Sequence, residues 1–259
     1  GGQRVGKFVP FTDNGTIAKS CIFNAGDSPK LTYSPSGSGD KQKFSFSCWY
    51  KPVNTGTRRV LYAVYHGNNT RYATIQVDDN DRLQLQSGAY TSGSSTSTVL
   101  DFVSNRTLED SSKFYNIVAI IDTTQSTQAD RVKIYLDGDQ ITSWSTATYP
   151  SQNDSLYYGT EHTTQFFADG NVAEMIYANG QTYTPAKFGL TDTSTGRWIP
   201  KTISSVTYGT NGFRLQFANS AGQTIGDDTS GNGNDFSVTN LATTDITTDT
   251  PTDLYPTLA

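Results

Sequence analysis

Hydrophobic and polar residues alternate along most of the chain with a period of two, which is the period of β-strands. The pattern is clearest at residues 131–137 (RVKIYLD), where Val132, Ile134 and Leu136 share one face. It predicts further strands at residues 19–24, 31–34, 44–51, 58–66, 71–77, 83–85, 99–103, 114–122, 156–159, 213–217 and 236–238. One helical turn is expected at 184–188, where Thr precedes a Pro at the first helical position.

The longest apolar run is residues 166–177 (FFADGNVAEMIY), which we expect to form the closing strands of a β-sandwich. Strand 44–51 is expected to be central, with Trp49 facing away from its other aromatic residues. Asp137-Gly138 and the tetrad 78–81 are hairpin signals.

Three regions follow from this pattern. Residues 1–18 are expected to be an N-terminal arm, and residues 19–203 a sandwich domain. Residues 204–259 are rich in Gly and Asn and too short to bury a core of their own. This segment should either pack on the sandwich or lead into a further module.

Composition narrows the function classes. The 259 residues carry a net charge of −5 with scattered Lys and Arg, which argues against a nucleic-acid surface. No apolar run reaches the length of a membrane span, so membrane insertion is not expected. The cysteines, Cys21 and Cys48, are either buried free thiols or a disulfide between neighbouring strands.

The single carboxylate of the apolar run, Glu174, is a candidate catalytic residue. Retaining glycoside hydrolysis needs two carboxyl groups about 5 Å apart. The neighbours of Glu174 at strand spacing are Val172 and Ile176, so it has no second carboxylate. We therefore expect a non-enzymatic protein in which Glu174 is partly buried and paired, with Arg58 or Arg59 as a conceivable partner.

Two oxygen-rich clusters are candidate Ca²⁺ sites, because Ca²⁺ prefers six to eight oxygen ligands. The alternative is that both are turns, since Asp and Asn hydrogen-bond their own backbone. The second cluster has the alternation of a calcium loop but carries Thr239 where such a loop has Glu. The candidate ligands are Asp78, Asp79 and Asp81 in the first cluster, and Asp227, Asp228, Ser230, Asn232, Asn234 and Asp235 in the second.

Sugar binding requires exposed aromatic rings beside amides and carboxylates. The candidate residues lie in or next to loops rich in Ser, Asn and Asp: Tyr90, Tyr149, Tyr157 and Tyr158. The alternative is that these tyrosines belong to the framework of the sandwich.

Several motifs together resemble a known family. They are SCIFNAGDSPKLTYS (20–34), FSFSCWYKP (44–52), VKIYLDGDQI (132–141) and FFADGNVAEMIYANGQTYTPAKFG (166–189), followed in order by TDTSTGRWIPK, YGTNGFRLQF, DDTSGNGNDF and DTPTD between 191 and 253. They resemble the concanavalin A-like, laminin-G-like jelly rolls in virion proteins of tailed, particularly marine, phages.

The resemblance implies an all-β antiparallel sandwich with a loop-rich C-terminal extension. It also implies a structural or adhesion protein on the exterior of a phage particle, as a tail fibre or capsid decoration. The implied partners are other virion proteins, further copies in a homo-oligomer or multivalent array, and host glycans, with Ca²⁺ as a frequent ion of laminin-G-like relatives. The alternatives are a secreted glycan-binding module of a carbohydrate-active enzyme and a purely architectural capsid protein.

Overall fold

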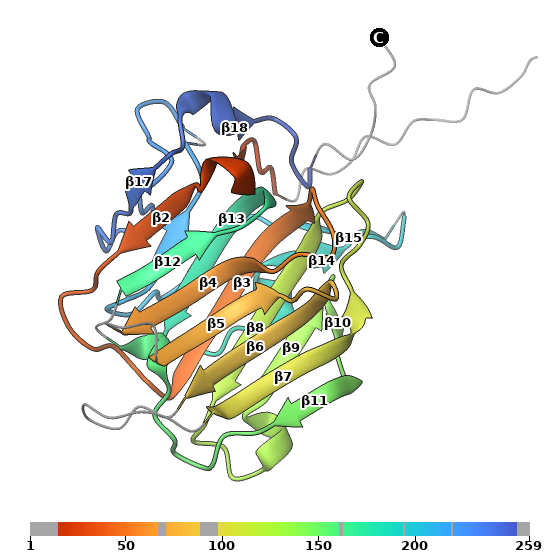
Figure 1. The fold of residues 1–259 in the computed structure, drawn as a ribbon, viewed down its shortest axis with the longest axis vertical. Coiled ribbons are helices and arrows are strands. Elements are labelled where there is room, and N and C mark those ends of the chain that lie inside the picture. Colours follow the sequence, from red (N-terminus) through yellow and green to blue (C-terminus); the bar gives the residue numbers. More distant parts are fainter. Residues whose placement is uncertain are drawn as a thin grey trace, which may run out of the picture.

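The computed structural model describes residues 15–66, 71–88, 98–160, 163–193, 195–218 and 220–252, which form two antiparallel sheets packed face to face (Figure 1). The first sheet has the order β10 (Asp139–Gln140), β9 (Val132–Leu136), β8 (Tyr115–Asp122), β3 (Lys43–Pro52), β13 (Gly170–Asn179), β1 (Ser20–Phe23) and β18 (Ile246–Thr247), with β16 (Phe213–Leu215) also pairing with β13. The second has the order β11 (Trp144–Thr148), β7 (Thr98–Thr107), β6 (Arg82–Gly88), β5 (Arg71–Val77), β4 (Arg59–His66), β12 (Thr163–Phe167), β2 (Lys30–Tyr33) and β17 (Ser237–Thr239). The predicted all-β sandwich is confirmed.

The remaining elements are short. β14 (Gly189–Thr191) and β15 (Trp198–Pro200) form a two-stranded sheet. Single-turn 3-10 helices are η1 (Ala25–Asp27), η2 (Gln128–Asp130), η3 (Tyr157–Gly159), η4 (Pro185–Lys187) and η5 (Thr243–Asp245). None of the helices in the described ranges has the length and apolar character that crossing a membrane requires.

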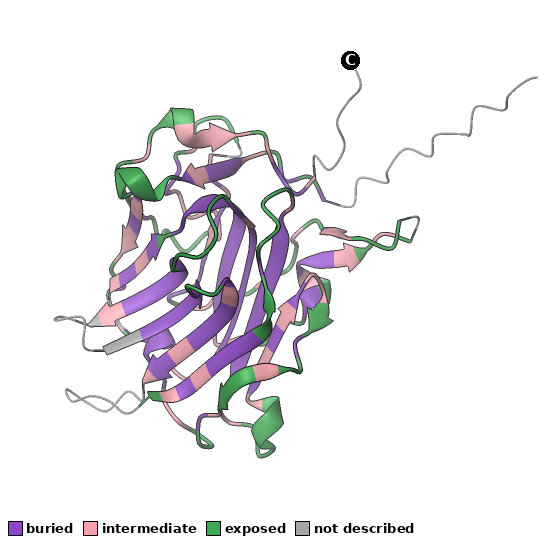
Figure 2. Ribbon diagram, turned by 45° about the vertical axis from the view of Figure 1, so that its right-hand side comes forward, coloured by how far each residue is buried: buried purple, intermediate pink, exposed green. Residues whose placement is uncertain are grey.

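The core lies between the two sheets, and buried residues concentrate on their strands (Figure 2). On β3, Phe46, Cys48 and Tyr50 face this core, whereas Trp49 packs on the opposite face with Phe114. The prediction that this strand is central, with Trp49 facing away from its other aromatic residues, is therefore confirmed. The second sheet differs, because no described element crosses its outer face in Figure 1.

The C-terminal region adds strands to both sheets. β16 pairs with β13, β17 pairs with β2, and β18 pairs with β1. The two described ends of the chain also meet, since the Ile17 amide donates to Thr252 Oγ1 at 2.9 Å. Residues 213–247 thus extend the sandwich.

Some of the predictions for single segments are confirmed, and one is wrong. The helical turn at 184–188 is confirmed as η4, and Asp137-Gly138 is a hairpin turn with φ of 53° and 83°. The strand predicted at 156–159 is wrong, because this segment forms η3. The run 166–177 is divided by a turn into β12 and β13.

Cys21 and Cys48 are both free and buried, as one of the two alternatives predicted. Burial is the main cause that raises the pKa of Cys21 to about 12, and burial also raises the pKa of Cys48. Since the thiolate is the reactive form, these cysteines are chemically inert side chains of the core.

Candidate functional site

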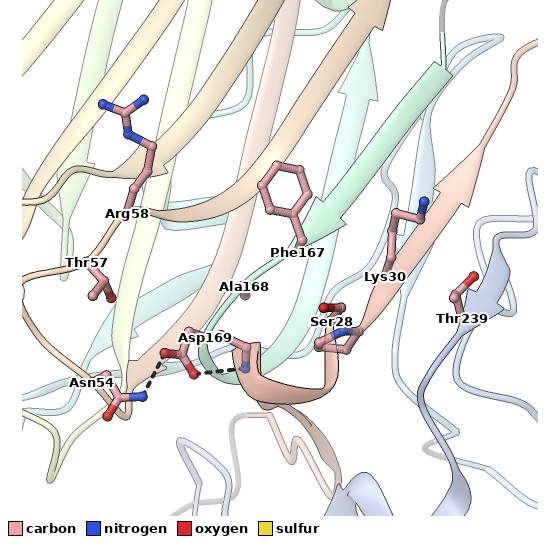
Figure 3. Close-up of a pocket in the computed structure, with 11 residues that line it drawn as sticks. Ser28, Lys30, Asn54, Thr57, Arg58, Phe167, Ala168, Asp169 and Thr239 are labelled. Carbon is pink, nitrogen blue, oxygen red and sulfur yellow. Dashed lines mark hydrogen bonds between the residues drawn. The ribbon is translucent and has the colours of Figure 1, made fainter. Parts of the chain in front are cut away.

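A pocket of about 540 Å³ lies at one end of the sandwich, where three connections meet (Figure 3). These are the β1–β2 connection with η1, the β3–β4 loop, and the turn between β12 and β13. Side chains in or next to each connection line the pocket, together with Thr239 of β17: Lys30, Asn54, Thr57, Arg58, Phe167 and Asp169. The β1–β13–β3 pairing brings the three connections together, because these strands are neighbours in the first sheet.

The floor of the pocket is fixed by Asp169, which is only 6% exposed. Its carboxylate accepts hydrogen bonds from Asn54 Nδ2 at 2.8 Å and from the Ala25 amide at 3.4 Å (Figure 3). Its carbonyl accepts from the Tyr50 hydroxyl at 2.6 Å. Asp169 therefore joins the three connections, and both of its carboxylate oxygens already have donors.

Arg59 holds the β3–β4 loop that carries Asn54 in place. Its side chain is fully buried, and its guanidinium donates to the Asn54 carbonyl and pairs with the Asp81 carboxylate. Asp81 in turn accepts from the Gly56 amide at 2.9 and 3.0 Å. The β3–β4 loop is thus attached to the β5–β6 hairpin through a buried cation.

The wall of the pocket is formed by the ring of Phe167, which is 37% exposed and stacks against Tyr65 with the centroids 6.3 Å apart. Arg58 and Lys30 lie on either side of this ring in Figure 3. The Arg58 side chain is 59% exposed, and its nearest carboxylate, on Asp79, is 3.8 Å away. Such an arrangement suits a ligand with both kinds of surface, because the ring can contact its apolar part and the two cations its polar part.

The open face of the second sheet continues from this ring. Phe167 lies in register with Val60, Gln76 and Gln84 on successive strands. Gln76 donates to Gln84 at 2.7 Å, and Gln84 donates to Asp101 at 3.0 Å. Since these amides bond to each other and are 3% and 9% exposed, they stiffen the face and present little polar surface to solvent.

Residues 25–184 match the family profile of the concanavalin A-like lectin/glucanases superfamily. The chain belongs to this superfamily. The match covers more than half of the 259 residues and contains most of the pocket. No curated protein sequence matches the chain.

Solved structures that resemble the chain are distant from it in sequence. A Bacteroides ovatus protein that has been proposed to bind carbohydrate is 12% identical, with a TM-score of 0.53 over 90% of this chain and 60% of its own. Mouse laminin α1 domains LG4–5 are 11% identical, with a TM-score of 0.43 over 77% and 47%. The CBM40 of Ruminococcus gnavus IT-sialidase, bound to α2,3-sialyllactose, is 13% identical, with a TM-score of 0.41 over 66% and 96%. At 12% identity the likeness to the Bacteroides ovatus protein concerns the fold alone.

Two of the predicted sugar-binding tyrosines are core residues of this concanavalin A-like sandwich. Tyr157 and Tyr158 are 1% and 2% exposed, and the Tyr158 hydroxyl donates to the carbonyls of Thr74 and Gln86. The prediction is wrong for this pair because η3 turns both rings inward. Tyr149 is partly buried against Phe102 and stays a prediction. Tyr90 lies outside the described residues.

The first predicted calcium cluster is a hairpin turn bound by arginines. Asp78 accepts from the amides of Asn80 and Arg82, both at 2.9 Å, and from the Arg82 guanidinium at 2.7 Å. Burial raises the pKa of Asp78, but these hydrogen bonds outweigh it and the pKa is lowered overall. With Asp81 held by Arg59, the buried carboxylates are already neutralised, so the cluster does not fit a Ca²⁺ ion.

The second cluster is also a set of turns. The Asp228 carboxylate accepts from the amides of Arg214, Ser230 and Asn234 and from the Ser230 hydroxyl, while Asp227 accepts from Thr224. The side-chain amides of Asn232 and Asn234 donate to backbone carbonyls, and Asp235 accepts from the Asp228 amide. In the described ranges, which include both clusters, no three His, Cys, Asp or Glu residues are grouped to hold a metal. These hydrogen bonds agree with the turn alternative, and Ca²⁺ binding at the second cluster stays a prediction.

Glu174 is paired, but its partner is Arg214 of β16 at 2.5 Å. The partners suggested by the sequence bind elsewhere, Arg58 near Asp79 and Arg59 to Asp81. The register of β13 shifts between Ala173 and Ile176, and Glu174 has a φ of 46° in this bulge. Burial is the largest single influence on the pKa of Arg214 and lowers it, but the charges and hydrogen bonds of Glu174 and Tyr208 together raise the pKa above its ordinary value.

We predict that Glu174→Gln lowers the free energy of unfolding by about 1–3 kcal/mol, because the half-buried Arg214 loses its counter-charge. Urea denaturation measures this. The matched control is Glu109→Gln, at an exposed position, with an expected change below about 0.5 kcal/mol. Equal effects of the two substitutions would contradict the ion pair as a stabilising contact.

Proposed function

We propose that this protein is a carbohydrate-binding module without hydrolytic activity, which holds a saccharide in the pocket beside Phe167. We further propose that it acts in adhesion on the exterior of a tailed-phage virion. The observation that carries the binding proposal is the exposed Phe167 ring at the wall of the pocket.

The dimensions and chemistry of the pocket suit a small saccharide. Its volume of about 540 Å³ lies within the usual range of ligand sites. The Phe167 ring offers a flat apolar surface to the C–H groups of a pyranose, while Thr57, Thr239 and Asn54 offer polar groups for its hydroxyls. A mostly apolar lining with a few convergent polar groups is typical of such sites.

We predict that Phe167→Ala weakens saccharide binding at least about tenfold, which corresponds to about 1.4 kcal/mol. Isothermal titration with oligosaccharides chosen from a glycan array measures the effect. The melting temperature should change little, because the ring is partly exposed. Val53→Ala is the matched control, since Val53 is 53% exposed on the β3–β4 loop and does not line the pocket. Unchanged affinity in Phe167→Ala would refute the site.

The non-enzymatic part of the proposal follows from the carboxylates. Asp169 is the only carboxylate among the residues that line the pocket, and both of its oxygens have donors. Glycoside hydrolysis by the usual retaining or inverting route needs two carboxyl groups across the scissile bond. We therefore expect no release of reducing sugar from any oligosaccharide that binds.

The virion setting is supported by the resemblance of the ordered C-terminal segments between residues 191 and 253 to phage virion proteins. Many copies on a particle would turn weak contacts into avidity for a host surface. Antibody-labelled electron microscopy of phage particles tests this setting. Label at the tail or capsid surface would support it, and label confined to free protein would favour a secreted binding module.

A further inference from the structure

We infer that the saccharide bound beside Phe167 is acidic, with a carboxylate held by Arg58 and the charge of Lys30 on the other side of the ring. This inference rests on the proposed function, since it names the class of ligand for the same pocket. The observation behind it is the charge of the lining, which includes two cationic side chains, Arg58 and Lys30, and one carboxylate, Asp169.

The charges of the lining differ in their availability to a ligand. Asp169 is 6% exposed, and its oxygens are directed to Asn54 and the Ala25 amide. Lys30 makes no ion pair with any described residue. The positive charges therefore reach the ligand, whereas the negative charge is bound within the floor.

Arg58 is suited to exchange its partner. Its distance of 3.8 Å from Asp79 is too long for a hydrogen bond, and the two side chains are 59% and 66% exposed. Ion pairs of this kind contribute little to stability. A ligand carboxylate can form two parallel hydrogen bonds with the planar guanidinium, which is the geometry that Arg favours.

The positive charge of the pocket also contrasts with the negative net charge of the whole protein. The chain has a net charge of −5, so the protein as a whole repels an acidic glycan at long range. A cationic pocket on such a protein directs an anionic ligand to one place. The flat Phe167 ring would also contact the sugar ring, and this contact distinguishes the site from one that binds any anion.

The test compares two oligosaccharides that differ at one group, one ending in glucuronic acid and the other ending in glucose. Titration calorimetry at low salt should show at least about tenfold tighter binding of the acidic form, and this preference should shrink near 0.15 M salt. Arg58→Gln should abolish the preference by weakening binding of the acidic form, and Lys30→Gln should reduce the preference. Arg106→Gln, which removes the same charge from an exposed position on β7, should keep the preference.

The outcomes separate the inference from the proposed function. Equal binding of the two oligosaccharides, abolished in both cases by Phe167→Ala, would overturn the acidic specificity and leave the carbohydrate site intact. Displacement of the acidic oligosaccharide by an equal concentration of inorganic sulfate would also overturn it, because the sugar ring would then contribute nothing. Binding of neither oligosaccharide, nor of any other saccharide on an array, would remove the proposed function itself.

Discussion

Arg59→Met is expected to lower the free energy of unfolding by about 3–5 kcal/mol, as is typical when one partner of a buried ion pair is removed. The Arg59 side chain is fully buried, and the Asp81 carboxylate beside it is 11% exposed. Methionine fills a similar space but leaves Asp81 with an uncompensated charge and frees the Asn54 carbonyl. Urea denaturation followed by far-UV circular dichroism measures the loss.

Arg58→Met is the matched control for stability, because the same chemical change falls on a side chain that is 59% exposed. Its effect on unfolding should stay below about 0.5 kcal/mol. In the double variant Arg59→Met with Asp81→Asn, the buried charge is gone and part of the stability should return. Similar losses for the two single arginine variants would contradict the role assigned to the buried pair.

Gly170→Ala is expected to destabilise the protein by about 2–4 kcal/mol, through backbone strain and a steric conflict. Gly170 begins β13 with a φ of 140°, a conformation that side chains rarely adopt. An added Cβ would lie 2.3 Å from the carbonyl oxygen of Lys51 on the paired strand β3. Thermal and urea denaturation measure the loss.

The control for this substitution is Gly37→Ala. A Cβ at Gly37 meets no atom within 4 Å, so its effect should stay below about 0.5 kcal/mol. Because Gly170 follows Asp169 directly, we also expect Gly170→Ala to weaken saccharide binding by shifting the floor of the pocket. A stable Gly170→Ala protein with unchanged binding would show that the β12–β13 turn is more adaptable than described.

The fold was predictable from local signals because its strands follow the period of two. In β9, inward Val132, Ile134 and Leu136 alternate with half-buried Lys133 and Tyr135. The segment at η3 was predicted wrongly, since a short apolar run with two tyrosines fits a strand and a buried turn equally well.

The bulge at Glu174 could not be read from the chain, because alternation gives no sign of one inserted residue. Strict alternation placed Glu174 on the face of Val172. The inserted residue instead directs it to Arg214, which lies 40 positions away in the sequence. The pairing was predictable from the cost of a buried charge, but the partner depended on which strand lies next to β13.

The candidate site was missed because its residues come from three distant connections. Their proximity depends on the β1–β13–β3 pairing, which local patterns do not specify. One signal was present in the sequence: in a strand ending Phe166-Phe167, only one ring can face the core. Phe166 is 1% exposed and Phe167 is 37% exposed, so the second ring was the aromatic candidate to choose.

The most direct test of the proposed site is a map of backbone amide chemical shifts while the protein is titrated with the oligosaccharide ending in glucuronic acid. The largest changes should cluster at Lys30, Asn54, Arg58 and Phe167, and should saturate together. Changes confined to the loop at 227–235 or to Tyr149, with the pocket amides unaffected, would contradict a saccharide site beside Phe167.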